Sequence, residues 1–543
     1  MQPVDSSVPS GEKALSRSSQ RMRLAGMLSL FFGAPTAGLA ASLIVVVSMG
    51  ILRLVAGIPA PVELFGDRVL KSLDVFTFVR LLITFAPNSK TAPLGLALLG
   101  MIALGTLLGI LYAILARPAL PVSGYRPGKR EWLVAAVFAV AMTLIGVIIF
   151  WGELGQNLFG LPLQWAALLS GLGLGIDFAL YAITLCLVYR ALLPKKPLAD
   201  VPAPVQQRRQ LFANAGVAAL SIGAGAGAFG LVRGYLARYA SYDGMTPPPH
   251  AGNVTPPITP NNEHYVVTQN TIDPTPNIDL WRLEITGLVK NPGTYTYAEV
   301  ERLPSISRAV TLECIANGIG GHLISTAIWQ GVRWQTLLDL HGGVKPGASH
   351  VAFYSVDGYV VSLPLQELLA VDPIFAWRMN GEVLPQRHGY PLRALIPGRY
   401  GEENPKWLTR IEVTDHFVGG LYSDQGWYNG PLHTITRIDR PRGQVATGQV
   451  IEVGGIAFAG NRGIKKVEIN VDGGENWQPA TLQLPLSPDS WVLWTWNWQP
   501  ASRGTHTLTA RSTDGTGETQ PAFQQITVPD GAMGYHIVVV TVV

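Results

Sequence analysis

The chain contains very little cysteine. Only Cys186 and Cys314 occur among its 543 residues. Cys186 lies inside a long apolar segment and Cys314 lies in the polar second half, so we expect them in different compartments and not in a disulfide. No Cys-x-x-Cys-His motif is present, so we expect no covalently attached haem.

Histidine and charged residues are also few, and both are unevenly distributed along the chain. All ten histidines lie between His250 and His536, so the first part of the chain offers no bis-histidine haem ligation and we expect no haem. Charged residues make up only 14% of the chain and the mean hydropathy is +0.26, values unusual for a soluble protein. The apolar excess ends near Val232, and ordinary globular composition follows.

Five stretches before that point approach the roughly 20 apolar residues that a membrane-spanning helix needs. They cover residues 33–52, 94–116, 132–151, 165–189 and 211–232. We therefore predict a five-helix transmembrane domain over residues 1–235. The apolar stretch 75–85 is too short to span and is predicted to be a helix lying on the membrane surface.

Basic residues flank these stretches on alternate sides. They occur in the N-terminal tail and after the second and fourth stretches, whereas the loop after the third carries only Glu153. The positive-inside rule then predicts a cytoplasmic N-terminus. With five spans, the second half is then predicted to lie outside the cytoplasm. The basic residues are Lys13, Arg17, Arg21, Arg23, Arg117, Arg126, Lys129, Arg130, Arg190, Lys195, Lys196, Arg208 and Arg209.

Two features of the membrane part have alternative interpretations. Arg208 and Arg209 precede the fifth stretch and resemble a twin-arginine export signal, or they are plain positive-inside charge. Asp177 lies within the fourth stretch, where an acid is costly. It indicates a proton path, or a polar contact with a Ser or Thr of a neighbouring helix.

The second half divides by pattern into three parts. A Pro-rich linker covers residues 236–258, and short strand-like and helical runs over 259–430 indicate an α+β domain. Residues 431–543 show strands alternating with turns, which predicts an all-β immunoglobulin-like sandwich. A tryptophan series there indicates strand packing or, alternatively, an aromatic binding platform. Its members are Trp491, Trp494, Trp496 and Trp498.

Separated stretches between Thr259 and Val543 carry, in order, the motifs of one enzyme family. They are TPNNEHYVVTQN, LECIANG, LISTAIWQGVRW, MNGEVLPQRHGYPLRALIPGRYGEENPKWLTRIEV and GGIAFAG with IKKVEINVDGGENW. Together they resemble the sulfite oxidase family of molybdopterin-dependent oxidoreductases. With the apolar N-terminus, the chain resembles a membrane-anchored bacterial branch that ends in a Mo-co dimerisation domain.

The resemblance implies a molybdenum–molybdopterin cofactor with Cys314 as the metal-ligating and catalytic residue. A soft thiolate is a suitable transition-metal ligand, although a lone cysteine is also a common buried hydrophobe. Gly318, Gly320 and Gly321 would let the backbone approach the cofactor. The implied cofactor-binding residues are Tyr265, Asn317, Ser362, His388, Arg393 and Lys406. Without the resemblance, Arg393 and Lys406 would be taken as solvated charges and His388 as a turn residue.

The chain departs from the family pattern at expected cationic positions. Gly318 and Ile319 follow the Cys-x-x-Asn segment where sulfite oxidases have arginine, and Val267 and Gln269 replace an arginine and a histidine. Sulfite is therefore less expected, and a neutral oxide such as a sulfoxide is an equal candidate. Arg399 or Arg410 could supply the missing charge.

These patterns predict a membrane-anchored enzyme performing two-electron oxygen-atom transfer on a small sulfur or nitrogen oxide outside the cytoplasm. We expect a separate electron carrier, either a cytochrome or a quinone, a homodimer and no nucleic-acid partner. One alternative is a cofactor-free surface protein that binds through its immunoglobulin-like domain. Another is a transporter or sensor centred on Asp177.

Overall fold

The computed structural model describes most of the chain, in two compact units. It describes residues 27, 29–85, 91–156, 160–161, 163–197, 201–239, 255–269, 273–473 and 475–543. The basic N-terminal tail and residues 240–254 of the predicted linker lie outside the described residues. The first unit comprises residues 1–68, 91–156 and 163–239, and the second comprises residues 69–90, 157–162 and 240–543.

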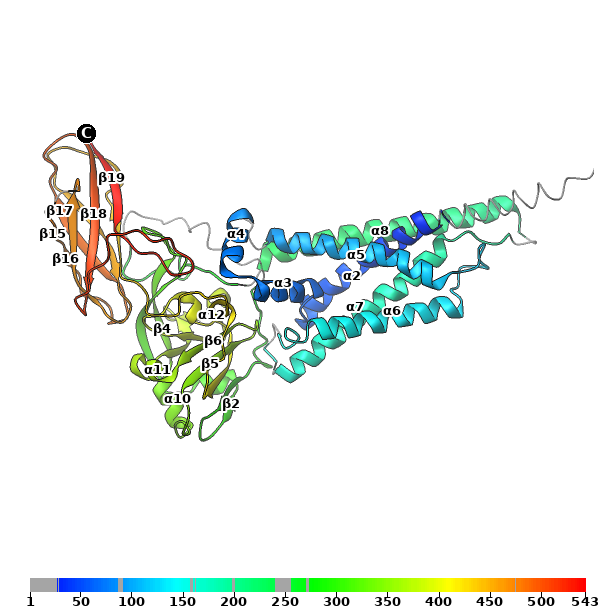
Figure 1. Ribbon diagram of the computed structural model, residues 1–543, viewed down its shortest axis with the longest axis horizontal. Coiled ribbons are helices and arrows are strands. Elements are labelled where there is room, and N and C mark those ends of the chain that lie inside the picture. The colour runs from blue at the N-terminus through cyan, green and yellow to red at the C-terminus, as the bar shows by residue number, and fades with distance from the viewer. Residues whose placement is uncertain are drawn as a thin grey trace, which may run out of the picture. The chain divides into compact units, whose positions relative to one another are not determined.

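The first unit is built of long helices (Figure 1). They are η1 (Ser29–Gly33), α2 (Ala34–Ala56), α5 (Thr91–Ala116), α6 (Lys129–Ile149), α7 (Leu163–Leu192) and α8 (Ala203–Tyr239), and α3 (Pro61–Ser72) follows α2. Among the described residues, five helices are long and apolar enough to cross a membrane, and each predicted span falls on one of them. They are Ser29–Ala56, Ala92–Ala116, Lys129–Ile149, Trp165–Leu192 and Pro204–Gly234.

Small residues let α2 pack closely against its neighbours. A Cβ atom placed on Gly38 would lie 2.7 Å from the carbonyl oxygen of Gly105 on α5, so a larger residue does not fit there. On the side facing α7, the Ser48 hydroxyl donates a 2.7 Å hydrogen bond to Asp177. Of the two interpretations of Asp177, the structure thus supports the polar contact with a Ser or Thr of a neighbouring helix.

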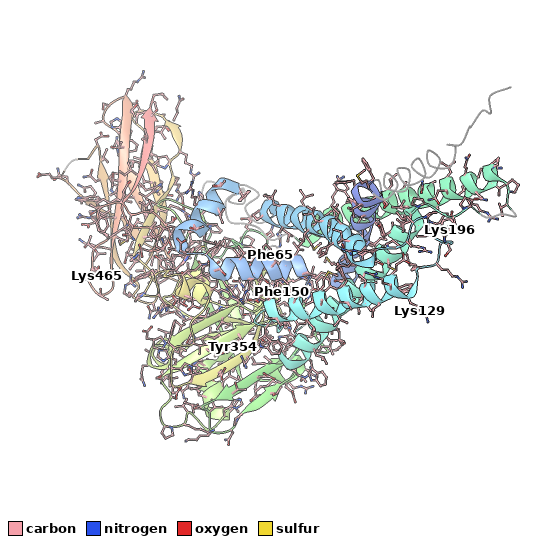
Figure 2. All side chains as sticks on the ribbon, turned by 45° about the vertical axis from the view of Figure 1, so that its right-hand side comes forward. Phe65, Lys129, Phe150, Lys196, Tyr354 and Lys465 are labelled. Carbon is pink, nitrogen blue, oxygen red and sulfur yellow. The ribbon has the colours of Figure 1, made fainter. Side chains whose placement is uncertain are left out.

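Two predicted basic loops meet at one end of this unit. The Arg190 guanidinium lies 3.0 Å from the Glu131 carboxylate and donates to the Ser123 carbonyl oxygen. Figure 2 shows Lys129 and Lys196 at this end of the unit, and Phe65 and Phe150 towards the other. The gathered positive charge accords with the positive-inside pattern, and the orientation itself stays a prediction.

The second unit begins with an α+β domain that contains two sheets. The first sheet has the order β2-β1-β10-β5-β6, and the second has the order β3-β4-β7-β8 with β9 on β7. Its strands are β1 (Leu283–Gly287), β2 (Gly293–Tyr295), β3 (Ser305–Glu313), β4 (Ile324–Arg333), β5 (His350–Ser355), β6 (Val360–Pro364), β7 (Ile374–Met379), β8 (Glu382–Val383), β9 (Arg393–Leu395) and β10 (Leu408–Thr414).

Short helices and a large aromatic core complete this domain. The helices are α9 (Tyr297–Glu301), α10 (Trp334–Leu340), α11 (Leu365–Val371), α12 (Leu421–Asp424), η2 (Gln386–His388) and η3 (Gly401–Glu403). The side chains of Trp281, Trp334, Phe353, Phe375 and Trp407 are almost completely buried in one cluster. Burial of such large side chains contributes much of the stabilisation of a domain of this size. This core supports the loops that carry the candidate site.

The predicted surface helix exists as α4 (Val75–Phe85) and belongs to the second unit. Phe78 packs edge-on against Trp427 and Tyr422, with ring centroids 6.0 Å and 6.4 Å apart. Phe76 is 75% exposed. One apolar side of α4 therefore covers the α+β domain, and contact of the rest with a membrane stays a prediction.

The C-terminal domain is all-β, as predicted. One sheet has the order β11-β13-β17-β16 and the other has the order β12-β19-β18-β14-β15, and both contribute to one core with Val453, Trp494 and Leu508 (Figure 1). Lys465 in Figure 2 marks β14. The strands are β11 (Ile435–Arg440), β12 (Gly443–Val445), β13 (Ile451–Phe458), β14 (Ile464–Val471), β15 (Gln478–Pro479), β16 (Thr481–Leu482), β17 (Val492–Trp498), β18 (Gly504–Asp514) and β19 (His536–Val542).

The tryptophan series of this domain packs inside it. Trp494 and Trp498 are buried in the sandwich core, and Trp496 is partly buried against it. Trp491 is buried in a separate cluster with Tyr400. Strand packing, and not an exposed aromatic platform, accounts for the series.

Candidate functional site

Cys314 follows directly after β3, and its side chain is buried and forms no disulfide among the described residues. Its backbone N–H donates to the Leu323 carbonyl oxygen at 2.9 Å, and its carbonyl oxygen accepts from the Asn317 N–H at 2.8 Å. These bonds close a compact loop between β3 and β4. The loop holds the thiol in a fixed position at the end of a strand.

Asn317 organises this loop through both ends of its amide. Its Nδ2 donates to the Glu313 carboxylate at 3.0 Å, and its Oδ1 accepts from the Leu323 N–H at 2.9 Å. A Cβ atom on Gly321 would approach this Oδ1 to 2.5 Å. Gly320 has a φ of +73°, and a Cβ there would lie 2.3 Å from the His536 ring. Loop packing thus already requires glycine at both positions, whatever the cofactor requires.

A cluster of basic side chains brings together three of the predicted cofactor-binding residues. The Arg393 guanidinium donates to the His388 carbonyl oxygen at 3.0 Å, and Lys406 Nζ donates to the Val267 carbonyl oxygen at 3.2 Å. The second histidine of the cluster is His264, whose ring centroid lies 5.0 Å from that of His388. Among the described residues, no carboxylate forms an ion pair with Arg393 or Lys406. The cluster is thus rich in positive charge, and the hydrogen bonds that Arg393 and Lys406 donate go to backbone carbonyl oxygens.

Burial makes this cluster electrostatically unfavourable on its own. It lowers the pKa of Arg393 to about 10 and the pKa of Lys406 to about 8. It also lowers the pKa of His388 to about 3 and the pKa of His264 well below its ordinary value, so both imidazoles are neutral at pH 7. Buried cations are costly, and a bound anion would add to the compensation that Lys406 receives from Asp273 and Asp357.

Two polar atoms of this cluster that lack a hydrogen-bond partner also indicate a bound ligand. Arg393 Nε and His264 Nε2 are buried without a hydrogen-bond partner among the described residues. Each such group costs about 1–3 kcal/mol unless a ligand satisfies it. The Arg393 guanidinium lies over the Trp329 ring, 5.0 Å from its centroid. Rigid donors beside an aromatic wall fit a flat heterocycle that ends in a phosphate, which describes the pterin cofactor.

Tyr265 connects this cluster to the cysteine. Burial raises the pKa of Tyr265, and the nearby Cys314 raises it further while Arg393 lowers it. Both Tyr265 and Cys314 belong to the hydrophobic cluster that contains Trp329. Tyr265 is thus electrostatically coupled to both the predicted metal ligand and the cationic cluster.

Ser362 lies apart from these residues in the first sheet. Its hydroxyl accepts a 3.2 Å hydrogen bond from the Val418 N–H. It lines a pocket with Glu402 and Tyr422. Among the interactions described, Ser362 thus has no contact with the basic cluster, and its role in cofactor binding stays a prediction.

Sequence reasoning missed three titratable residues near the thiol, namely His264, Glu313 and Glu402. Burial raises the pKa of Glu313 to about 8, although its hydrogen bond from Asn317 opposes this. The signal was present in the quoted motifs, because all three lie within them.

The two arginines considered as substitutes for the missing sulfite ligands are otherwise engaged. Arg399 lies 3.2 Å from the Glu403 carboxylate and also pairs with Glu367. Arg410 stacks on Tyr354, 3.8 Å from its ring centroid. Neither arginine lines the pocket beside Ser362.

Comparison with known families identifies the second half of the chain. Residues 271–422 match the oxidoreductase molybdopterin binding domain, and residues 433–542 match the Mo-co oxidoreductase dimerisation domain. The second half of the chain therefore contains the two domains that these family models describe, a molybdopterin-binding oxidoreductase domain and a Mo-co oxidoreductase dimerisation domain. The first match supports a molybdenum–molybdopterin cofactor.

Curated relatives share only part of their length with this chain. Nitrate reductase (NADH) 1 of Nicotiana tabacum is 29% identical over 44% of this chain and 33% of its own length. Nitrate reductase (NADH) of Solanum lycopersicum is 30% identical over 49% of this chain and 36% of its own. The chain thus spans about a third of the length of these relatives. Among solved structures, the sulfane dehydrogenase SoxCD from Paracoccus pantotrophus aligns with 50% of this chain and 76% of its own, at 24% identity and a TM-score of 0.46.

Gly401 gives a direct test of the geometry around the thiol. A Cβ atom there would lie 2.7 Å from the Tyr265 hydroxyl and 3.7 Å from the Cys314 Cα. We expect Gly401→Ala to displace the Tyr265 hydroxyl and to reduce the molybdenum content of the purified protein several-fold. Gly318→Ala is the matched control, because its nearest neighbour lies 3.8 Å away. Equal molybdenum content in both variants would contradict this packing.

Proposed function

We propose that the protein is a membrane-anchored molybdenum-cofactor-dependent oxidoreductase that transfers an oxygen atom and two electrons per turnover to or from a small sulfur or nitrogen oxide. The observation that carries the proposal is that the buried side chain of Cys314 and the Trp329 ring belong to one hydrophobic cluster, and that the buried Arg393 guanidinium lies over this ring, 5.0 Å from its centroid. A metal-ligating thiolate beside an anion-binding cluster is what a molybdenum–pterin group requires.

Each of these residues has a stated task in the proposal. Cys314 supplies the protein sulfur to the metal, and the loop closed by Asn317 fixes its direction. Arg393 and Lys406 hold the phosphate, while His264 and His388 face the pterin as neutral hydrogen-bonding groups. When bound, the cofactor supplies the change between two oxidation levels that oxygen-atom transfer needs.

The helical unit would serve as the anchor in a bacterial inner membrane. Five apolar helices of suitable length and basic loops gathered at one end support this role. In the proposed topology, the N-terminus is cytoplasmic and the catalytic domain is periplasmic. Electrons would then pass between the site and a separate cytochrome or quinone.

The C-terminal domain would be an immunoglobulin-like sandwich that joins two copies of the chain. The match to a dimerisation domain and the two-sheet architecture support this role. Ile537 and Val539 on β19 are 50% and 58% exposed, so the sheet that contains β19 has apolar surface with which a second copy could pack. A cofactor-free binding protein would not need the basic cluster, so the catalytic proposal accounts for more of the structure.

Elemental analysis tests the proposed function directly. The full chain should be purified in detergent from cells that make molybdopterin. We expect near-stoichiometric molybdenum, together with a phosphorylated pterin released on denaturation. Protein that is folded by circular dichroism but lacks both would refute the proposal.

A further inference from the structure

The C-terminal domain reaches the segment that carries Cys314. This segment, here called the cysteine loop, covers residues 314–323 between β3 and β4. Arg437 lies on β11 of the C-terminal domain, and its side chain is almost completely buried. Its Nη1 donates a 2.8 Å hydrogen bond to the carbonyl oxygen of Gly321 in the cysteine loop. A side chain outside the α+β domain thus holds the backbone of the loop that carries the thiol.

The Arg437 guanidinium is itself held in one orientation. Its Nε donates to the Asp439 carboxylate at 2.6 Å, and its Nη2 donates to the Thr255 hydroxyl at 2.8 Å. The Thr255 hydroxyl in turn donates to the same carboxylate. Because the guanidinium is planar and rigid, these bonds fix the direction of Nη1 as well. The donor to Gly321 is therefore directed by its partners on either side of the domain boundary.

His536 supports the neighbouring residue of the cysteine loop from β19. The Ile438 N–H donates to His536 Nδ1 at 2.9 Å, so the proton of the neutral imidazole is on Nε2. This edge of the ring lies against Gly320, where a Cβ atom would be 2.3 Å from Nε2 and 2.5 Å from Cδ2. The ring therefore blocks movement of Gly320 towards β19.

Contacts inside the cysteine loop connect these two glycines to the thiol. The Gly321 N–H donates to the Gly318 carbonyl oxygen at 2.7 Å, and a Cβ atom on Gly321 would lie 2.5 Å from the Asn317 amide oxygen. The Asn317 N–H donates to the Cys314 carbonyl oxygen at 2.8 Å. A displacement of Gly321 would therefore change the position of Asn317 and, through it, the direction of the Cys314 side chain.

We propose that Arg437 and His536 are positioning residues for the metal-binding thiol, so that the C-terminal domain orients Cys314 in addition to any role in joining two copies of the chain. The inference rests on the proposed function, because it concerns Cys314 as a ligand of molybdenum. Without these two side chains, the cysteine loop keeps its internal hydrogen bonds but loses the support that selects one position for it.

The first test measures thiol reactivity in the full-length protein purified without cofactor. Every variant carries Cys186→Ser, which leaves Cys314 as the single cysteine. Arg437→Met is combined with Asp439→Asn, because removing one partner of a buried ion pair leaves the other charge uncompensated. We expect iodoacetamide to modify Cys314 at least about 10-fold faster in this paired variant than in the parent protein. That factor corresponds to the loss of one charge-assisted hydrogen bond.

Arg462 provides a matched control in the same domain. Its guanidinium lies 2.8 Å from the Asp514 carboxylate, and its described hydrogen bonds reach no residue of the cysteine loop. Arg462→Met combined with Asp514→Asn removes a comparable ion pair, and we expect it to leave the iodoacetamide rate at Cys314 unchanged. Equal rates in the two paired variants would overturn the inference, because both would then report a general loss of stability.

His536→Ala provides an independent variant, since it removes a neutral ring and leaves the Arg437 ion pair in place. We expect faster modification of Cys314 in this variant as well. If the paired variant at Arg437 does not fold, this measurement decides, and an unchanged rate in folded His536→Ala would overturn the inference.

The molybdenum-loaded protein supplies a spectroscopic readout. The g-values of a paramagnetic metal depend on the orientation of its ligands. We therefore expect the electron paramagnetic resonance signal of molybdenum(V) to shift or broaden in the paired variant at Arg437 and in His536→Ala. The paired variant at Arg462 should retain the wild-type signal.

The outcomes separate this inference from the proposed function. Molybdenum-loaded protein in which thiol reactivity and the molybdenum(V) signal are the same in all variants would overturn the inference while the proposed function stands. Wild-type protein without molybdenum or pterin, purified from cells that make the cofactor, would overturn the proposed function and the inference with it.

Discussion

Replacing Cys314 with serine is expected to abolish oxygen-atom transfer. Serine keeps the size and the loop hydrogen bonds of the backbone but removes the soft sulfur ligand. Changing a group that only supports a metal ligand already costs about 10- to 100-fold in affinity or activity, so losing the ligand itself should cost more than about 100-fold in kcat. The measurement is viologen-dependent or ferricyanide-dependent turnover, normalised to the folded protein.

The chain contains its own control for this experiment. Cys186 is the other cysteine and is also a buried free thiol, but it lies on α7 in the helical unit. Cys186→Ser should leave turnover and molybdenum content unchanged. Equal activity in wild type and Cys314→Ser would refute the role assigned to Cys314. Equal losses in both serine variants would instead indicate a general effect on folding.

Removing the buried cations is expected to release the cofactor while leaving the fold intact. Arg393→Gln and Lys406→Met each remove a charge-assisted hydrogen bond to the phosphate, worth about 1.5–3 kcal/mol. We therefore expect about 10- to 100-fold weaker cofactor retention in each variant. Pterin released on denaturation and molybdenum per chain after dilution and gel filtration provide the measurement.

Stability of the cofactor-free protein distinguishes this role from a structural one. The cations are buried without an ion-pair partner among the described residues, so the melting temperature without cofactor should stay the same or rise in both variants. A purely structural role predicts a fall in melting temperature. Arg410→Gln on β10 is the control, since Arg410 stacks on Tyr354 away from the cluster, and it should retain the cofactor.

We expect Lys406 to make cofactor binding depend on pH, with weaker binding at higher pH. Its pKa in the cofactor-free site is lowered to about 8 by burial. Below that pH, the ammonium is charged and attracts phosphate, and above it the charge is lost. Cofactor rebinding should therefore weaken as the pH rises through about 8, and this dependence should disappear in Lys406→Met.

Much of the architecture could be predicted because its signals are local. Apolar length defined the long helices, and alternation of strands with turns indicated the all-β C-terminal domain. Cys314 was predicted at a strand end because an apolar run precedes it and glycines follow. Its role as a metal ligand was inferred from the motif and stays a prediction. The hydrogen bonds of Asn317 that fix the loop could not be predicted, because they depend on Leu323 across the turn.

The pocket that Ser362 lines with Glu402 and Tyr422 could not be predicted, for a physical reason. Glu402 belongs to a short polar stretch that would normally be solvated. Its carboxyl is buried only because segments far away in the sequence, including Tyr359 and Tyr422, surround it. Similarly, Arg399 was a candidate substrate ligand until its pairing with Glu403 and Glu367 was seen.

The most direct test of the central claim is molybdenum K-edge X-ray absorption of the wild-type protein and its Cys314→Ser variant. We predict that the molybdenum retained by the variant has one fewer sulfur neighbour than the wild-type metal, with an oxygen neighbour gained in its place. An unchanged sulfur count in Cys314→Ser would show that Cys314 does not bind the metal and would contradict the account.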